Sequence, residues 1–177
     1  MIKPRSAPTD IESAFNPKKD PRYRADGTNY GEILAGIARR LAVCGDSVAA
    51  DVAGRSHIDM EVRLAAVRVL RDPVTISGVA AWASTSGSEE EALAVGALER
   101  LARSIGLAKD VRDRKDIQSM LEIVAMYGTS KAAISAIGMI EDMGFLSLRI
   151  IEEKRPDVLE AAMRRRRVLN FVPKRRD

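Results

Sequence analysis

Apolar residues recur at spacings of three and four along most of this chain, and each such recurrence predicts an amphipathic helix. In the segment 30–43 the repeating positions are Ile33, Leu34, Ile37 and Leu41, with Arg39 and Arg40 on the wetter side. The segment 59–70 begins at Asp59, a residue type that caps helix N-termini. Its predicted inward residues are Val62, Ala65, Ala66, Val69 and Leu70, and its predicted outward residues are Arg63, Arg68 and Arg71.

The same pattern continues through the middle of the chain. Segment 74–83 is apolar nearly all round, which predicts a deeply buried helix. A strand is the alternative, because the segment begins with β-branched residues. Ser88 and Glu91 have the spacing of a capping box for a helix that ends near Ile105. We expect the acidic triplet 89–91 to serve that helix start, and the charged stretch 109–116 to be a solvated connector.

The stretch 116–146 contains two apolar-periodic segments that meet at Gly128, Thr129 and Ser130. This pattern predicts a helix, a tight turn and a second helix, anchored by Ile123, Tyr127, Ile134 and Ile137. The pattern of residues 147–153 is compatible with a strand or with a short helix. Pro156 suits the first position of a last helix, because proline lacks the amide hydrogen that would have no partner there.

These elements predict an all-α protein built as a compact bundle of six to eight helices. Residues 1–29 contain four prolines and scattered charge, which favours an extended N-terminal arm with one short anchoring turn at Ile11, Ala14 and Phe15. Residues 30–155 form the expected helical body, and residues 156–177 form the expected basic helix and tail. Only 4% of the residues are aromatic, so small apolar side chains must supply close helix packing.

The net charge of +4 conceals an uneven distribution. Residues 1–24 carry six Lys or Arg against three Asp or Glu, and residues 154–177 carry nine against three. The intervening part carries fourteen against nineteen. An acidic body with two basic ends directs positive potential outward, where an anionic partner would bind.

Enzymatic chemistry finds little support in the residue pattern. The single histidine, His57, lies in an expected loop without a second base or nucleophile nearby, and it cannot form a structural zinc site with Cys44 alone. No phosphate-binding glycine motif occurs, so we expect no enzyme, cofactor or metal. With one cysteine, no signal segment and no apolar run of membrane-spanning length, we expect an intracellular protein without a membrane span.

The stretch 116–146 resembles the helix-turn-helix of bacterial winged-helix and repressor-type regulators, in which a small residue permits the turn and apolar positions lock the two helices. Residues 141–146 resemble the end of a recognition helix that leads into a wing strand. The resemblance implies that Lys131, Ser135 and Ala136 face DNA. That helix carries one cation against the anions Glu141 and Asp142, so backbone binding would depend on Arg149, Lys154 and Arg155.

A competing interpretation is an antiparallel helical repeat, because EVRLAAVRVL resembles a repeat of the HEAT type. Segments 61–70, 91–101, 132–140 and 158–166 each look like one helix of a pair, at uneven separations.

The strongest candidate for nucleic-acid binding is the C-terminal cluster. Adjacent guanidinium groups match phosphate oxygens and release counterions whatever the base sequence. The residues are Arg164, Arg165, Arg166, Arg167, Lys174, Arg175 and Arg176.

We therefore expect a non-enzymatic protein that binds DNA or RNA through its C-terminal arginines and self-associates through its body, as a coat or nucleoprotein subunit or as a regulator. The alternative is a helical scaffold that binds another protein and has no nucleic-acid role.

Overall fold

The computed structural model describes residues 11–108, 110–146 and 155–171, and it confirms the all-α prediction. No strand occurs in these ranges. The α-helices are α1 (Ile11–Ala14), α2 (Tyr30–Cys44), α3 (Asp46–Gly54), α4 (Met60–Val69), α5 (Pro73–Thr85), α6 (Glu91–Ser104), α7 (Val111–Tyr127), α8 (Ser130–Met139) and α10 (Pro156–Phe171). Short 3-10 helices are η1 (Pro17–Lys19), η2 (Ser88–Glu90), η3 (Ile105–Leu107) and η4 (Met143–Phe145).

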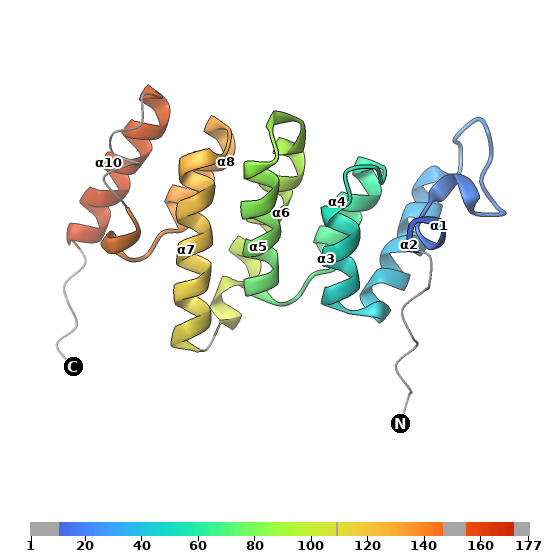
Figure 1. The fold of residues 1–177 in the computed structure, drawn as a ribbon, viewed down its shortest axis with the longest axis horizontal. Helices are drawn as coiled ribbons and strands as arrows, with labels where there is room; N and C mark the ends of the chain where they lie inside the picture. Colours follow the sequence, from blue (N-terminus) through green and yellow to red (C-terminus); the bar gives the residue numbers. More distant parts are fainter. Residues whose placement is uncertain (1–10, 109, 147–154, 172–177) are drawn as a thin grey trace.

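The helices form a row of two layers (Figure 1). Helices α2, α4, α6, α8 and α10 follow one another in one layer, and α3, α5 and α7 follow one another in the other. Across the layers, α3 packs on α4, α5 on α6 and α7 on α8. The four segments that suggested one helix of each pair, 61–70, 91–101, 132–140 and 158–166, thus all fall in the first layer.

Short polar residues start several of these helices. Asp59, Asp72, Asp110 and Thr129 each accept a hydrogen bond from a backbone N–H in the first turn of α4, α5, α7 and α8, respectively. Between α2 and α3 the chain reverses at Gly45, whose φ of 90° is a conformation that favours glycine. The predicted cap at Asp59 and the predicted start at Pro156 are confirmed.

One continuous core runs through the row, from Phe15 beside α2 to Ala162 of α10. Alanine supplies much of it, because its small side chain lets neighbouring helix backbones approach closely. Phe15 is 1% exposed, and Arg40 donates a hydrogen bond to the Ala14 carbonyl, so residues 11–15 are packed against α2. The short anchoring turn that we expected at Ile11, Ala14 and Phe15 is therefore present, as α1 and the residue after it. Residues 1–10 of the expected arm lie outside the described ranges.

Two local predictions about helix starts were wrong. Residues 111–116 do not form a connector but the first turns of α7, since Asp110 caps the helix and Arg114 donates to the Ala108 carbonyl. Ser88 and Glu91 do not form a capping box, because η2 precedes α6 and no side chain caps either element. The predicted buried helix at 74–83 is confirmed as part of α5, although Trp82 within it is 37% exposed.

The packing face of α8 also differs from the prediction. Ile134 is 39% exposed, whereas Ala132 and Ala136 are fully buried, although the resemblance implied that Ala136 faces DNA. Tyr127 at the end of α7, another expected anchor, is 60% exposed. The isoleucines suggested one face of the helix, but α8 turns its alanines inward because it packs closely on both α6 and α7.

Arg63 was expected to point outward and is instead 2% exposed in the middle of the row. Its guanidinium forms a two-pronged ion pair with Glu90, with nitrogen to oxygen distances of 3.0 and 2.5 Å. Its Nε donates to the Ala53 carbonyl at 2.9 Å, and the guanidinium lies 5.7 Å from the centre of the Trp82 ring. Arg63 therefore connects α4 to the end of α3, to α5 and to η2.

We predict that Arg63→Ala lowers the free energy of unfolding by about 3–5 kcal/mol, because it leaves the Glu90 carboxylate buried without its partner. Chemical denaturation of the variant and the parent protein measures this difference. Arg68→Ala is the matched control, since Arg68 lies on the same helix and is exposed; its effect should stay within about 0.5 kcal/mol. Equal losses in the two variants would contradict a special role for the buried pair.

Candidate binding groove

Two of the arginines predicted to bind nucleic acid are occupied by the fold. Arg155 donates to the carbonyl of Gly128, with longer contacts of 3.5 Å to the carbonyls of Ala125 and Met126 at the end of α7. The Nε of Arg165 donates to the Ile140 carbonyl at 2.7 Å, at the end of α8. Both side chains satisfy carbonyl groups that a helix end leaves without intrahelical partners.

The remaining predicted basic residues divide into two groups. Arg164 forms an exposed ion pair with Glu160 one turn earlier at 2.7 Å, while Arg166 and Arg167 are exposed and make no ion pair with the described part of the chain. The other predicted residues lie outside the described ranges: Arg149, Lys154, Lys174, Arg175 and Arg176.

The residues implied by the helix-turn-helix resemblance do not share one exposed face. Lys131 is exposed, and the partly buried Ser135 donates its hydroxyl to the Lys131 carbonyl at 3.0 Å. Ala136 is fully buried, so it cannot contact a base edge. The helix, turn and helix predicted for 116–146 are present as α7, Gly128–Thr129 and α8, followed by η4. The region proposed for the wing strand beyond Leu146 is outside the described residues.

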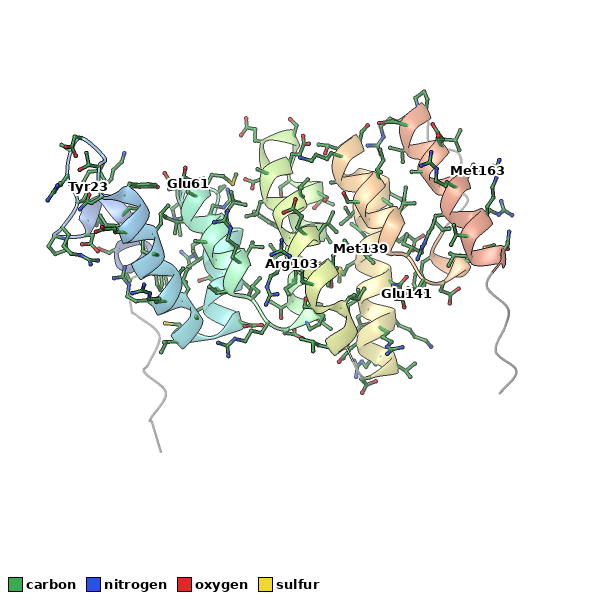
Figure 2. All side chains as sticks on the ribbon, turned by 180° about the vertical axis from the view of Figure 1, so that it is seen from behind. Tyr23, Glu61, Arg103, Met139, Glu141 and Met163 are labelled. Carbon is green, nitrogen blue, oxygen red and sulfur yellow. The ribbon has the colours of Figure 1, made fainter. Side chains whose placement is uncertain are left out.

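The structure brings together a different set of charged residues, in an open groove of about 940 Å³ along the first layer. Helices α4 and α6 form its walls, η2 contributes one end, and Lys131 of α8 reaches its margin. Figure 2 views the molecule from the side opposite to Figure 1 and labels Arg103, which lines this groove at the end of α6.

The two ends of the groove differ in charge. Glu89 and Glu91 line it at the start of α6, whereas Arg103 lines it at the end of the same helix and Arg68 lines it near the end of α4. Lys131, in the first turn of α8, lies near Glu91, and Glu99 lies between the two ends. Arg100 also lines the groove, but its Nε is held by the Leu70 carbonyl at 2.8 Å.

Small and apolar residues line the space between the charged groups: Leu64, Val67, Ala92, Val95 and Gly96. A Cβ atom at position 96 would lie 3.1 Å from a methyl carbon of Leu64, so glycine at this position gives α4 and α6 room to approach.

Sequence reasoning missed this groove although part of its pattern was visible. Glu91, Val95, Glu99 and Arg103 follow one another at four-residue intervals and therefore share one side of α6. That stripe by itself also fits a solvated helix surface. Only the packing of α6 beside α4 turns it into one wall of a concave surface.

A metal site is not found among the described residues. No group of three or more His, Cys, Asp or Glu that could hold a metal ion occurs within the described ranges. His57 is exposed beside a small hollow at the N-terminal end of the row, near Tyr30 and Asp59. Burial, and then a hydrogen bond of 3.0 Å to Asp59, raise the pKa of Tyr30, which keeps its phenol protonated.

Comparisons of this chain with protein-family models, with curated proteins and with solved structures find no match. No helix in the described part of the chain has the combination of length and apolar character that a membrane span requires.

Gly128, whose carbonyl accepts the hydrogen bond from Arg155, lies in the turn between α7 and α8. Substitution of this residue tests how closely the turn is packed. Gly128→Ala would place a Cβ atom 2.6 Å from the Val124 carbonyl oxygen and 3.3 Å from the Ser84 hydroxyl. We predict a loss of about 1–3 kcal/mol in the free energy of unfolding, measured by denaturation.

Gly138→Ala is the control for this prediction, because a Cβ atom there meets nothing within 4 Å and lies inside a helix. It should leave stability unchanged or raise it by up to about 1 kcal/mol. If Gly128→Ala unfolds with the same free energy as the parent protein, the neighbouring atoms can shift to admit the Cβ atom and the prediction is wrong.

Proposed function

We propose that this protein is a non-enzymatic helical scaffold that binds a segment of a partner protein in the groove along α4 and α6. The observation that supports this proposal is the groove itself, which is open and has apolar residues between two charged ends. Glu89, Glu91 and Lys131 lie toward one end, and Arg68 and Arg103 lie toward the other. Concave surfaces across stacked helices serve such binding in repeat architectures.

The charges of the groove define the partner. The lining mixes carboxylates and cations: Glu89, Glu91 and Glu99 with Arg68, Arg100, Arg103 and Lys131. A nucleic-acid backbone is uniformly negative, so it would meet three like charges here. A polypeptide can instead place a cation beside Glu91 and an anion beside Arg103. Charge complementarity of this kind selects the partner and its orientation more than it raises affinity.

The length of the groove sets the length of the bound segment. Glu91 and Arg103 are separated by about 18 Å along α6, at about 1.5 Å per helical residue. An extended segment covers that distance with five or six residues at about 3.3 Å each. The proposed ligand is therefore a short peptide segment with small apolar residues between a basic end and an acidic end.

Selection from a phage-displayed library of random peptides tests this proposal. We expect the enriched peptides to carry a cation and an anion separated by a few small residues. In anisotropy measurements, Arg103→Glu and Glu91→Lys should each weaken binding of a selected peptide by at least about tenfold, or about 1.4 kcal/mol.

Arg112→Glu is the matched control, because it reverses an exposed charge on α7 in the other layer. The Arg112→Glu variant should bind the selected peptide with the affinity of the parent protein. The scaffold proposal fails if no peptide is enriched over an unrelated helical protein, or if enriched peptides bind both groove variants as tightly as the parent.

Nucleic-acid binding through the C-terminal arginines is a second candidate, favoured by the exposure of Arg166 and Arg167. It includes the coat, nucleoprotein and regulator roles considered from the sequence. Since Arg155 and Arg165 already donate to backbone carbonyls, this function would depend on Arg166, Arg167 and the basic residues beyond α10.

For this candidate we predict that Arg166→Ser with Arg167→Ser weakens binding to random-sequence DNA and RNA. The slope of log affinity against log salt should fall by about two, one unit for each lost phosphate contact. Fluorescence anisotropy over a series of salt concentrations measures both effects.

Arg112→Ser with Lys115→Ser removes the same charge from α7 and controls for net charge. If the parent protein shows no binding at low salt, or if the control pair loses as much affinity as the α10 pair, the arginines of α10 are not a nucleic-acid site.

A further inference from the structure

A second hollow lies between α8 and α10 at the C-terminal end of the row, with a volume of about 460 Å³. Ile134 and Ile137 of α8 and Ala161 and Val168 of α10 provide its apolar surface. Ile134 is 39% exposed and Val168 is 48% exposed. Such side chains lose contact with water when a partner helix covers them, which favours association.

The charges that surround this apolar surface are ordered along α10. Asp157 and Glu160 lie in its first half, and Arg164 and Arg165 lie in its second half, all lining the same hollow. Arg167 adds an exposed positive charge to the second half. A hydrogen bond from Ser130 lowers the pKa of Asp157, so its carboxylate is negative at neutral pH.

We propose that a second copy of this chain covers the hollow, with its α10 antiparallel to the first α10 about a twofold axis. The exposed Val168 and Ile134 of each copy would then be covered by the other copy. Because an antiparallel pair sets the first half of one helix against the second half of the other, every carboxylate half faces an arginine half.

The register of this pair follows from the positions of the charges. An axis beside the middle of α10, near Ala161 and Ala162, places Glu160 opposite the partner subunit's Arg164. The same axis places Asp157 opposite the partner subunit's Arg167. Residues at equal distances from a twofold axis pair with each other, so a charge sequence that is negative and then positive complements itself.

This self-complementarity distinguishes a second copy from an unrelated partner. The present pair between Arg164 and Glu160 is 77% and 71% exposed, and a pair so open to water contributes little to stability. Its two side chains can turn toward a second α10 without disturbing the core. With its 16 residues, α10 is about 24 Å long, which is ample for a helix pair.

Sedimentation velocity over a range of protein concentrations tests the proposal on the full chain. We expect the parent protein to dimerise. Val168→Glu should raise the dissociation constant of the dimer at least about tenfold, because it places a carboxylate in the apolar surface. Glu160→Arg and Arg164→Glu should each weaken the dimer, since each sets like charges opposite one another.

The double variant Glu160→Arg with Arg164→Glu is the decisive measurement. It exchanges the two charges and restores complementarity across the axis, so the dimer should regain most of its affinity. Circular dichroism of each variant verifies that the helices remain formed. Arg112→Glu on α7 should leave dimerisation unchanged.

The proposal is overturned if the parent protein is a monomer at every concentration, or if Val168→Glu and the single charge reversals leave its dimer unchanged. It is also overturned if the charge-exchanged variant is as weak as either single reversal. Groove binding is independent of this surface: Arg103→Glu should remain dimeric, so failure of one proposal is distinguishable from failure of the other.

Discussion

The ion pair between Arg63 and Glu90 connects elements that are far apart along the chain. The side chain of Arg63 in α4 donates a hydrogen bond to the Ala53 carbonyl near the end of α3 and two hydrogen bonds to Glu90 of η2. Its guanidinium also lies over the Trp82 ring of α5. Because Glu90 immediately precedes α6, this contact positions the start of α6. Glu89 and Glu91 flank it, so the pair that stabilises the core also directs two neighbouring carboxylates toward the groove.

Arginine has a recurring structural role in this protein. Arg63, Arg100, Arg155 and Arg165 each donate to a carbonyl at or near the end of a helix in a neighbouring element. A helix end leaves such carbonyls without intrahelical partners, and an arginine fork reaches them while its aliphatic stem packs against apolar neighbours. The number of basic residues in the chain therefore exceeds the number available to an anionic partner.

The two-layer arrangement accounts for the positions of the two proposed binding surfaces. Neighbouring helices of one layer leave a groove between them on the outer side. The groove between α4 and α6 has Glu91 near one end and Arg103 near the other. At the C-terminal end of the row, α10 packs on α8 but leaves Val168 and Ile134 partly exposed.

The sequence by itself determined the all-α class, most helix positions, the cap at Asp59, and the helix, turn and helix around Gly128, because helical periodicity and capping depend on neighbouring residues. It did not determine which charged side chains are buried. Arg63, Glu90 and Arg165 are paired with groups 25 or 27 residues away, and alanine faces such as that of α8 carry too weak a periodic signal to orient a helix. The candidate site needed the tertiary structure as well, because Glu91, Glu99 and Arg103 form a stripe on one helix and become a groove only when α4 packs beside it.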